Sequence, residues 1–169
     1  MNWIERKVNN HYSHYNAKKY WKLKFKLQNK KTNKLIKYYA MLKLKKMDAF
    51  NNASLGHRID GGSYFQEEPF FPHGIKGIFI AERAKIGKKV TIFQQVTIGV
   101  KDFANNNLCG PEIWDNVFIG AGVKIIGNIK IGNNVKIGAN CVVFQDIPDN
   151  ATVVLDKPRI IIKEGSNND

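Results

Sequence analysis

The sequence predicts a mainly β solenoid, in which short strands coil around a narrow prism, and three observations indicate it. Aliphatic residues recur every six positions from Ile80 to Ile98, and the same step resumes from Ile113 to Val143. A small residue often follows the aliphatic one, and a second small or β-branched residue stands four positions after it. Helices repeat at 3.6 residues and ordinary strands at 2, whereas a fixed period of six is typical of hexapeptide β-helices.

The corners between the strands should carry residues with special backbone freedom. Each hexapeptide is expected to form one strand and one corner, and three hexapeptides should close one triangular coil. Corners need conformations that most L-residues avoid, including the left-handed region that Gly and Asn tolerate best. The expected corner pairs fit this requirement: Asp115-Asn116, Ala121-Gly122, Asn133-Asn134 and Ala139-Asn140.

Charge divides the chain into parts. Residues 1–50 hold 14 Lys and Arg against 2 acidic residues, whereas the remainder holds 13 Lys and Arg against 12 acidic residues. We therefore expect a basic, largely α-helical N-terminal region at 1–50, a β-helix at 51–155 with a loop at 100–112, and a tail at 156–169.

The basic region has a predicted helix and two alternative roles. Thr32-Asn33 is expected to cap a helix in which Leu35, Tyr38, Tyr39, Leu42 and nearby lysines form an amphipathic surface. Residues 21–27 alternate as a strand would, although a helix is also compatible. We expect this region to cover the first coil with its aromatic residues packed beneath it. Contact with anionic lipid or an anionic glycan precursor is the alternative, and no recognised nucleic-acid module is present.

The remaining composition favours a cytoplasmic enzyme. Cys109 and Cys141 provide no disulfide framework, and Cys141 falls on an inward position of the repeat. No stretch approaches the roughly 20 apolar residues of a membrane span, and no signal peptide is visible. Peripheral contact with the inner face of the cell membrane through residues 1–50 is the alternative location.

Two segments resemble a known family. Phe71-Pro72-His73-Gly74 with Gly77-Ile78-Phe79-Ile80, and the run IFQQVTIG at 92–99, are similar to the serine acetyltransferase-like branch of hexapeptide-repeat acyltransferases. The resemblance covers residues from about Asn52 to Arg159. It implies a left-handed parallel β-helix, acetyl-CoA as the acetyl donor, no metal, and a homotrimer with active sites between neighbouring subunits.

His73 is the candidate general base. An alcohol is a poor nucleophile until its proton leaves, and an imidazole can take that proton and return it to the departing thiolate. The resemblance places the catalytic histidine just before the strand that begins near Ile78, where His73 stands. Such a histidine needs an orienting acceptor, and Asp60, Glu67 or Glu68 could provide it, with Asp60 and Glu68 favoured equally. His57 is a weaker candidate because it lies in a loop.

The resemblance also implies where the donor binds. The pantetheine arm should lie along the groove between adjacent prisms, where small corner residues allow close approach to the main chain. Lysine and arginine in the tail could meet the nucleotide phosphates. The expected donor contacts are Gly99, Ala121, Gly122, Ala139, Lys157 and Arg159.

Departures from the family pattern indicate the acceptor. Serine acetyltransferases carry an Asp where this chain has Pro72, and an Arg-His-Pro run where it has Cys109-Gly110-Pro111. An amino acid needs charged partners, whereas a sugar hydroxyl does not. The prediction is therefore O-acetylation of a sugar or lipid-linked oligosaccharide in surface-polysaccharide synthesis, with Phe103 or the Asn run at 105–107 as loop contacts. The alternatives are a serine O-acetyltransferase and a non-catalytic hexapeptide-repeat assembly protein.

Overall fold

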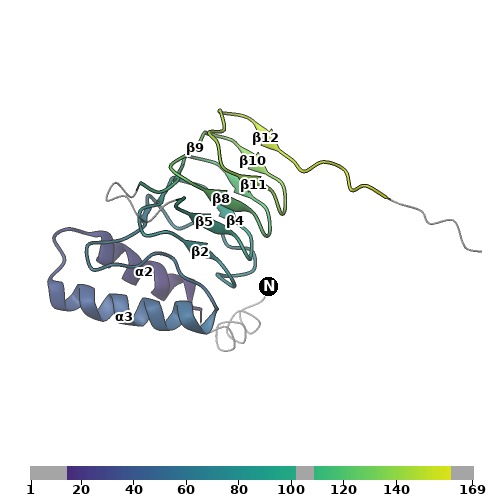
Figure 1. Cartoon of the computed structure of the whole chain (residues 1–169). Coiled ribbons are helices and arrows are strands. Elements are labelled where there is room, and N and C mark those ends of the chain that lie inside the picture. Colours follow the sequence, from purple (N-terminus) through teal and green to yellow (C-terminus); the bar gives the residue numbers. More distant parts are fainter. Residues whose placement is uncertain (1–14, 102–108, 161–169) are drawn as a thin grey trace, which may run out of the picture.

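The computed structural model describes residues 15–101 and 109–160 (Figure 1). Two helices, α2 (Ala17–Gln28) and α3 (Lys34–Phe50), precede a stack of short strands. The strands are β1 (Tyr64–Phe65), β2 (Phe79–Ile80), β3 (Lys85–Ile86), β4 (Thr91–Ile92), β5 (Thr97–Gly99), β6 (Glu112–Ile113), β7 (Phe118–Ile119), β8 (Lys124–Ile126), β9 (Lys130–Ile131), β10 (Lys136–Ile137), β11 (Val142–Val143) and β12 (Thr152–Val153).

The strands form three parallel sheets around one axis. Their orders are β1-β3-β6-β9, β12-β10-β7-β4 and β11-β8-β5-β2. Ile80 pairs with Ile98, which stands three hexapeptides further along the chain, and Ile98 pairs with Ile125 across the coil that carries the loop. One coil therefore contains three hexapeptides, and the predicted β-helix is confirmed.

The interior of the prism consists of the two inward positions of each repeat. The aliphatic position is buried from Ile80 to Val143, with at most 3% of any of these side chains exposed. The side chains four residues later are also buried, as at Ala84, Val96 and Cys141. This confirms the predicted packing of Cys141 in the core. The width of the prism explains the residue types, because bulkier side chains would overpack it.

The corners adopt the conformations that their residues suggested. Asn116, Asn134 and Asn140 have φ values of 58°, 58° and 60°. At one corner, Asn116 donates from Nδ2 to Asn134 Oδ1 over 2.8 Å, and Asn134 donates in the same way to Asn150 over 2.9 Å. This ladder links side chains of successive coils along one edge of the stack.

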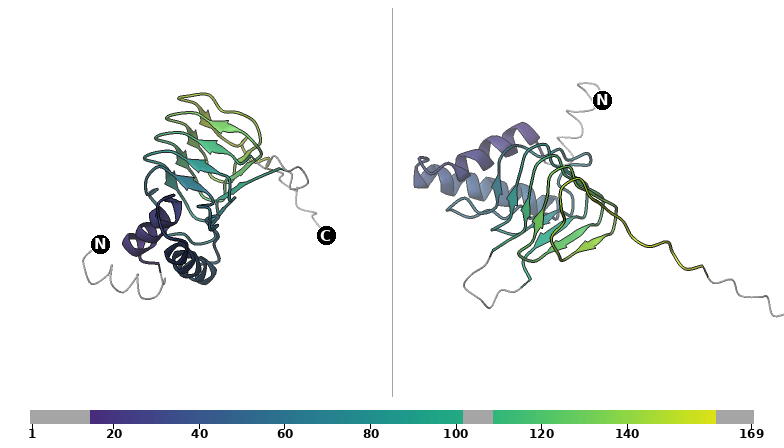
Figure 2. Two further views of the ribbon diagram at one scale, coloured as in Figure 1. Left: turned by 90° about the vertical axis from the view of Figure 1, so that its left-hand side faces the viewer. Right: turned by 90° about the horizontal axis from the view of Figure 1, so that it is seen from above.

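The helices cover the end of the stack where the first coil lies (Figure 2). Residues 21–27 lie in α2, so the strand interpretation of this segment is wrong. Tyr20, Trp21, Lys24 and Leu27 recur at helical spacing and are buried. The Trp21 ring meets the Phe65 ring edge-on, with 5.0 Å between their centroids. Packing onto the coil therefore selects a helical period over the local alternation.

The second helix presents an apolar face outward. It begins as predicted, because the Asn33 side chain accepts a hydrogen bond from the Leu35 amide over 2.8 Å. However, Leu35, Tyr38, Tyr39 and Leu42 are between 52% and 80% exposed, since the helix buries Ala40 and Leu44 on its opposite side. Tyr20 and Trp21 of α2 pack against the first coil as expected, whereas Tyr38 and Tyr39 of α3 do not. Neither described helix has the length and apolarity needed to cross a membrane.

Candidate functional site

His73 lies in a turn that precedes β2, and its side chain is exposed. Its ring is 5.8 Å from the Phe93 ring, measured between centroids. The imidazole borders a hollow of about 620 Å³, which we call the His73 hollow. Its described lining residues are Phe50, Asn51, Asn52, His73, Lys76, Gly77, Gln94 and Gln95.

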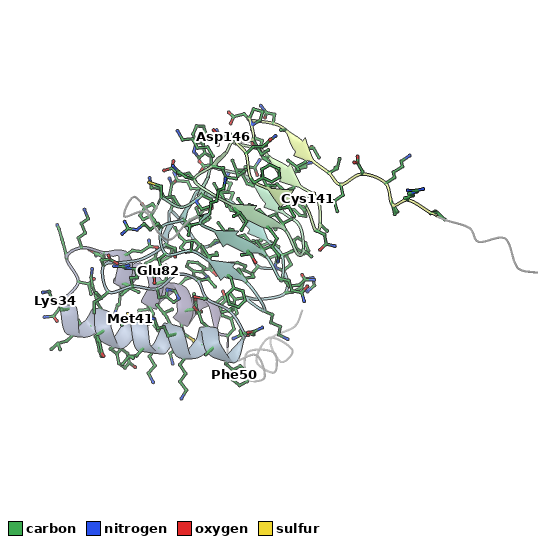
Figure 3. All side chains as sticks on the ribbon, viewed as in Figure 1. Lys34, Met41, Phe50, Glu82, Cys141 and Asp146 are labelled. Carbon is green, nitrogen blue, oxygen red and sulfur yellow. The ribbon has the colours of Figure 1, made fainter. Side chains whose placement is uncertain are left out.

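Backbone hydrogen bonds hold the turn on two sides. The Gly77 amide donates to the Asn51 carbonyl over 3.1 Å, and the Gln95 amide donates to the Lys76 carbonyl over 3.2 Å. Gly77 has a φ of +65°, and a Cβ there would lie 3.3 Å from the Gln95 Cγ. The turn is thus fixed between the end of α3 and the corner that follows β4; Figure 3 labels Phe50 at this end of α3.

The His73 hollow lies at one end of a stack of corners from successive coils. The Gly122 amide donates to the Gln94 carbonyl over 3.0 Å, and the Asn140 amide donates to the Ala121 carbonyl over 2.8 Å. We call this stack of corners, at 94–95, 121–122 and 139–140, the corner column. It places three predicted donor contacts, Ala121, Gly122 and Ala139, above the hollow that His73 borders.

The two favoured acidic residues occupy different places. Asp60 forms an exposed ion pair with Arg58 at 3.2 Å and borders a separate hollow of about 330 Å³. Glu68 is exposed, and partial desolvation raises the pKa of its carboxyl group. The Glu67 side chain accepts a hydrogen bond from the Lys89 amide. In the described parts of the chain, no carboxylate is hydrogen-bonded to His73, so the orienting residue remains a prediction.

The other predicted contacts are apart from the His73 hollow. Gly99 borders a third hollow of about 500 Å³, together with Thr97 and Ile126. Lys157 and Arg159 are exposed on an extended segment that leaves the stack after β12 (Figures 1 and 2). Phe103 and the Asn run at 105–107 lie outside the described residues.

Sequence reasoning missed a buried polar cluster between the helices and the first coil. Tyr20 donates from its hydroxyl group to Asp48 Oδ1 over 2.6 Å, and His57 Nε2 lies 2.8 Å from the same hydroxyl and 3.2 Å from Asp48 Oδ2. Lys24 Nζ lies 3.3 Å from His57 Nδ1 and donates to Ser63 Oγ over 2.9 Å. The only sequence signal was the helical spacing of Tyr20 and Lys24, which the strand interpretation set aside.

The proton positions in this cluster follow from its geometry. The single hydroxyl proton of Tyr20 goes to Asp48, so Tyr20 can only accept from His57. The ring proton therefore belongs on Nε2 of His57, and Nδ1 is free to accept from Lys24. Burial lowers the pKa values of both His57 and Lys24, the latter to about 7. With every ring nitrogen engaged and His57 only 3% exposed, the cluster connects elements rather than offering a reactive group.

Comparisons with known proteins place the fold. Residues 110–145 match the family model described as bacterial transferase hexapeptide (six repeats). Serine acetyltransferase isoform 3 of Entamoeba histolytica, solved in complex with cysteine, superposes with a TM-score of 0.64 at 35% identity, over 78% of this chain and 47% of that one. Soybean serine acetyltransferase, complexed with serine, gives 0.61 at 31% identity, over 75% and 49% of the two chains.

Curated relatives agree with these structures. Serine acetyltransferase of Staphylococcus epidermidis (strain RP62A) is 38% identical over 112 residues, which cover 65% of this chain and 51% of the relative. Serine acetyltransferase of Staphylococcus aureus (strain N315) is 39% identical over the same length and shares of the chains. The chain thus spans about half the length of the curated relatives it matches.

These comparisons confirm some predictions and contradict another. The chain has the left-handed β-helix of hexapeptide-repeat transferases, as the resemblance implied. Within that class, it resembles the serine acetyltransferase branch. The prediction of a polysaccharide O-acetyltransferase is wrong, because the relatives and structural neighbours found at this identity are serine acetyltransferases. Pro72 and Cys109-Gly110-Pro111 lack the charges that an amino-acid acceptor needs, but missing charges at two positions do not exclude charges elsewhere in the site.

Proposed function

We propose that this protein is an acetyl-CoA-dependent O-acetyltransferase whose acceptor is the hydroxyl group of L-serine. The observation that carries the proposal is the position of His73, which borders an open hollow directly beneath the corner column. The names of the similar proteins supply the reaction class and the acceptor.

The reaction requires one residue to move a proton twice. His73 accepts the hydroxyl proton of serine while the oxygen attacks the thioester carbonyl carbon, which forms a tetrahedral intermediate. The intermediate collapses with cleavage of the carbon–sulfur bond, and the thiolate leaves. His73 then returns the proton to that thiolate, which regenerates the neutral imidazole and leaves O-acetylserine and CoA.

The donor would run along the corner column. Gly122 has a φ of +72°, and a Cβ there would lie 2.1 Å from Asn140 Oδ1, so a side chain at this corner would be strained and would displace the Asn140 amide. A thin pantetheine arm can approach such a backbone closely. In this proposal Ala121 and Ala139 line the arm, Gly99 contacts the donor from the separate hollow that it borders, and Lys157 and Arg159 meet the phosphates.

Glu68 is the better supported of the two orienting acids. Its charge acts on the buried Tyr15 hydroxyl, whose pKa is raised chiefly by desolvation. A Cβ placed on Gly74 would lie 3.7 Å from the Tyr15 ring, so Tyr15 borders the residue next to His73. Asp60, by contrast, is engaged with Arg58.

The assembly in this proposal is a homotrimer, because the β-helix presents apolar side chains outward. Phe79, Phe118, Val142 and Phe144 are between 41% and 71% exposed. Association of three copies would cover such residues and close hollows that are open on one chain.

The direct test is the release of CoA from acetyl-CoA by the purified protein, with and without L-serine. We expect serine-dependent release, and we expect His73→Ala to lower it by roughly 10²- to 10⁴-fold, as for loss of a general base. An unchanged thermal transition would show that the variant is folded. Absence of serine-dependent release from the folded wild-type protein would refute the proposal, and absence of acetyl-CoA binding as well would favour the non-catalytic alternative.

A further inference from the structure

We propose that Lys76 and Gln94 bind the α-carboxylate and the α-ammonium group of the acceptor, and so select an amino acid over other alcohols. This inference rests on the proposed function, since it concerns the acceptor of that reaction. It concerns the His73 hollow, which both residues line.

A zwitterionic acceptor makes three demands on its site. Its carboxylate needs a cation, its ammonium group needs an acceptor of hydrogen bonds, and its hydroxyl group needs a base. The charged residues that the resemblance leads one to expect are absent at Pro72 and at Cys109-Gly110-Pro111. If serine is the acceptor, other residues of this chain must meet the first two demands.

Lys76 meets the first demand. It stands three residues after His73, and its backbone is anchored because its carbonyl accepts from the Gln95 amide over 3.2 Å. Its side chain is exposed, and within the described residues no carboxylate forms an ion pair with it. None of the described residues that line the hollow is acidic. The ammonium group of Lys76 is therefore available to a carboxylate, which would find no competing negative charge there.

Gln94 meets the second demand. Its Oε1 atom is buried and is the one side-chain polar atom in the described chain that is both buried and without a hydrogen-bond partner. Buried acceptors are normally paired, and Gln94 is among the residues that line the hollow, so its unpaired Oε1 indicates a missing donor. The backbone of Gln94 is fixed by the hydrogen bond that its carbonyl accepts from Gly122. An ammonium group, with three N–H donors, is a suitable partner for Oε1.

The arrangement explains how the site can differ from its relatives and keep the same acceptor. Lys76, Gln94 and His73 line one hollow of about 620 Å³, which exceeds the size of a serine molecule and leaves room for the acetyl group. A neutral sugar has no carboxylate and would form no ion pair with Lys76. The inferred class of acceptor is thus a hydroxy-α-amino acid.

The first arm of the test needs no variant. Initial rates of CoA release are measured with L-serine, with ethanolamine, which lacks the carboxylate, and with 3-hydroxypropionate, which lacks the ammonium group. We expect kcat/KM for L-serine to exceed the value for either truncated acceptor by at least about 10-fold, because the matching protein group is then left unpaired. Equal values for all three acceptors would overturn the inference.

The second arm assigns the two residues. Lys76→Met should lower kcat/KM for L-serine by about 10-fold or more, chiefly through KM, and leave ethanolamine unaffected. Gln94→Met should lower the value for L-serine and leave 3-hydroxypropionate unaffected. Lys76→Arg should retain discrimination because the charge remains. Lys130→Met, on β9 in the sheet that does not flank the corner column, is the matched control and should change none of the values.

The results distinguish failure of the roles given to Lys76 and Gln94 from failure of the proposed function. If the wild-type protein shows no serine-dependent release, the proposed function fails and the inference fails with it. If the wild type acetylates serine and Lys76→Met lowers the rates with serine and ethanolamine equally, only the inference is overturned, since Lys76 would then act on the fold or the donor.

Discussion

Lys24 donates a hydrogen bond from Nζ to Ser63 Oγ over 2.9 Å, in the closed contact between α2 and the first coil. Neither side chain is exposed to solvent. The same ammonium nitrogen donates to the Gly61 carbonyl over 3.3 Å, and Ser63 donates to the Leu55 carbonyl over 2.5 Å. Because a buried amine is stable in its charged form only with strong compensation, this contact makes the attachment of the helices sensitive to pH.

We predict that the protein becomes more stable as the pH rises from 7 to about 9.5. Burial lowers the pKa of Lys24 to about 7, whereas an unfolded lysine titrates near 10.5. Between these values the unfolded chain binds a proton that the folded chain does not, so the free energy of unfolding rises with pH and falls as the pH drops toward 7. The expected gain is on the order of 2 kcal/mol, measured by urea unfolding at both pH values.

A matched pair of variants isolates this effect from the general repulsion in a basic chain. Lys24→Met should flatten the rise between pH 7 and 9.5, whereas Lys22→Met, at an exposed position of the same helix, should leave it unchanged. An equal slope in all three proteins would show that Lys24 does not titrate in this window.

Asp48, the one acidic residue in α2 and α3, should be highly sensitive to substitution. Its two oxygens accept from the Tyr20 hydroxyl over 2.6 Å and from the Leu55 amide over 2.9 Å, and His57 Nε2 lies 3.2 Å away. Asp48→Ala leaves these donors buried without a partner, so we expect a loss of about 3 kcal/mol in the free energy of unfolding. Asp156→Ala, on the exposed tail, should cost less than about 0.5 kcal/mol in the same denaturant titration.

Gly122 should tolerate a small side chain less well than another corner glycine, Gly138. Gly122→Ala combines a φ of +72° with a contact of 2.1 Å to Asn140 Oδ1, so we expect destabilisation by about 1–3 kcal/mol. Gly138 has no positive φ, and the nearest atom to its added Cβ is the Val153 carbonyl oxygen at 3.3 Å. Gly138→Ala should therefore lower the thermal midpoint less; a similar shift in both variants would contradict this explanation.

The proposed trimer predicts a mass in solution of about three times the 19.3 kDa of one chain. Sedimentation equilibrium measures it directly. Phe144→Glu replaces a side chain that is 71% exposed on the β-helix, and it should shift the population toward single chains without loss of the fold. A wild-type protein that sediments as a single chain at all concentrations would contradict the trimer.

The repeat could be predicted because its information is local. Ile80, Ile98 and Ile125 each lie inside for the same reason, and several corners, such as those at Asn116 and Gly122, have Asn or Gly where φ is positive. His73 could be placed as a candidate base for a similar reason, since its motif lies within one short segment. Neither prediction needed any knowledge of which distant residues meet.

The acceptor preference and the attachment of the helices could not be predicted in this way. Pro72 and Gly110 suggested a site without charged partners, but the fold brings Lys76 and Gln94 to the hollow from two different coils. Residues 21–27 alternate locally, yet packing on Phe65 makes them helical.

The sequence by itself therefore determined the β-helix, its inward residues and most of its corners, because these depend on a short period that every coil repeats. It also indicated His73 as the candidate base, through a motif within one short segment. Only the tertiary structure decided which residues share the His73 hollow, that Lys24 and Ser63 meet in a closed contact, and that α3 turns its aromatic residues outward. Those features depend on pairs far apart in the chain, whose burial and charge interactions arise only when the helices pack on the first coil.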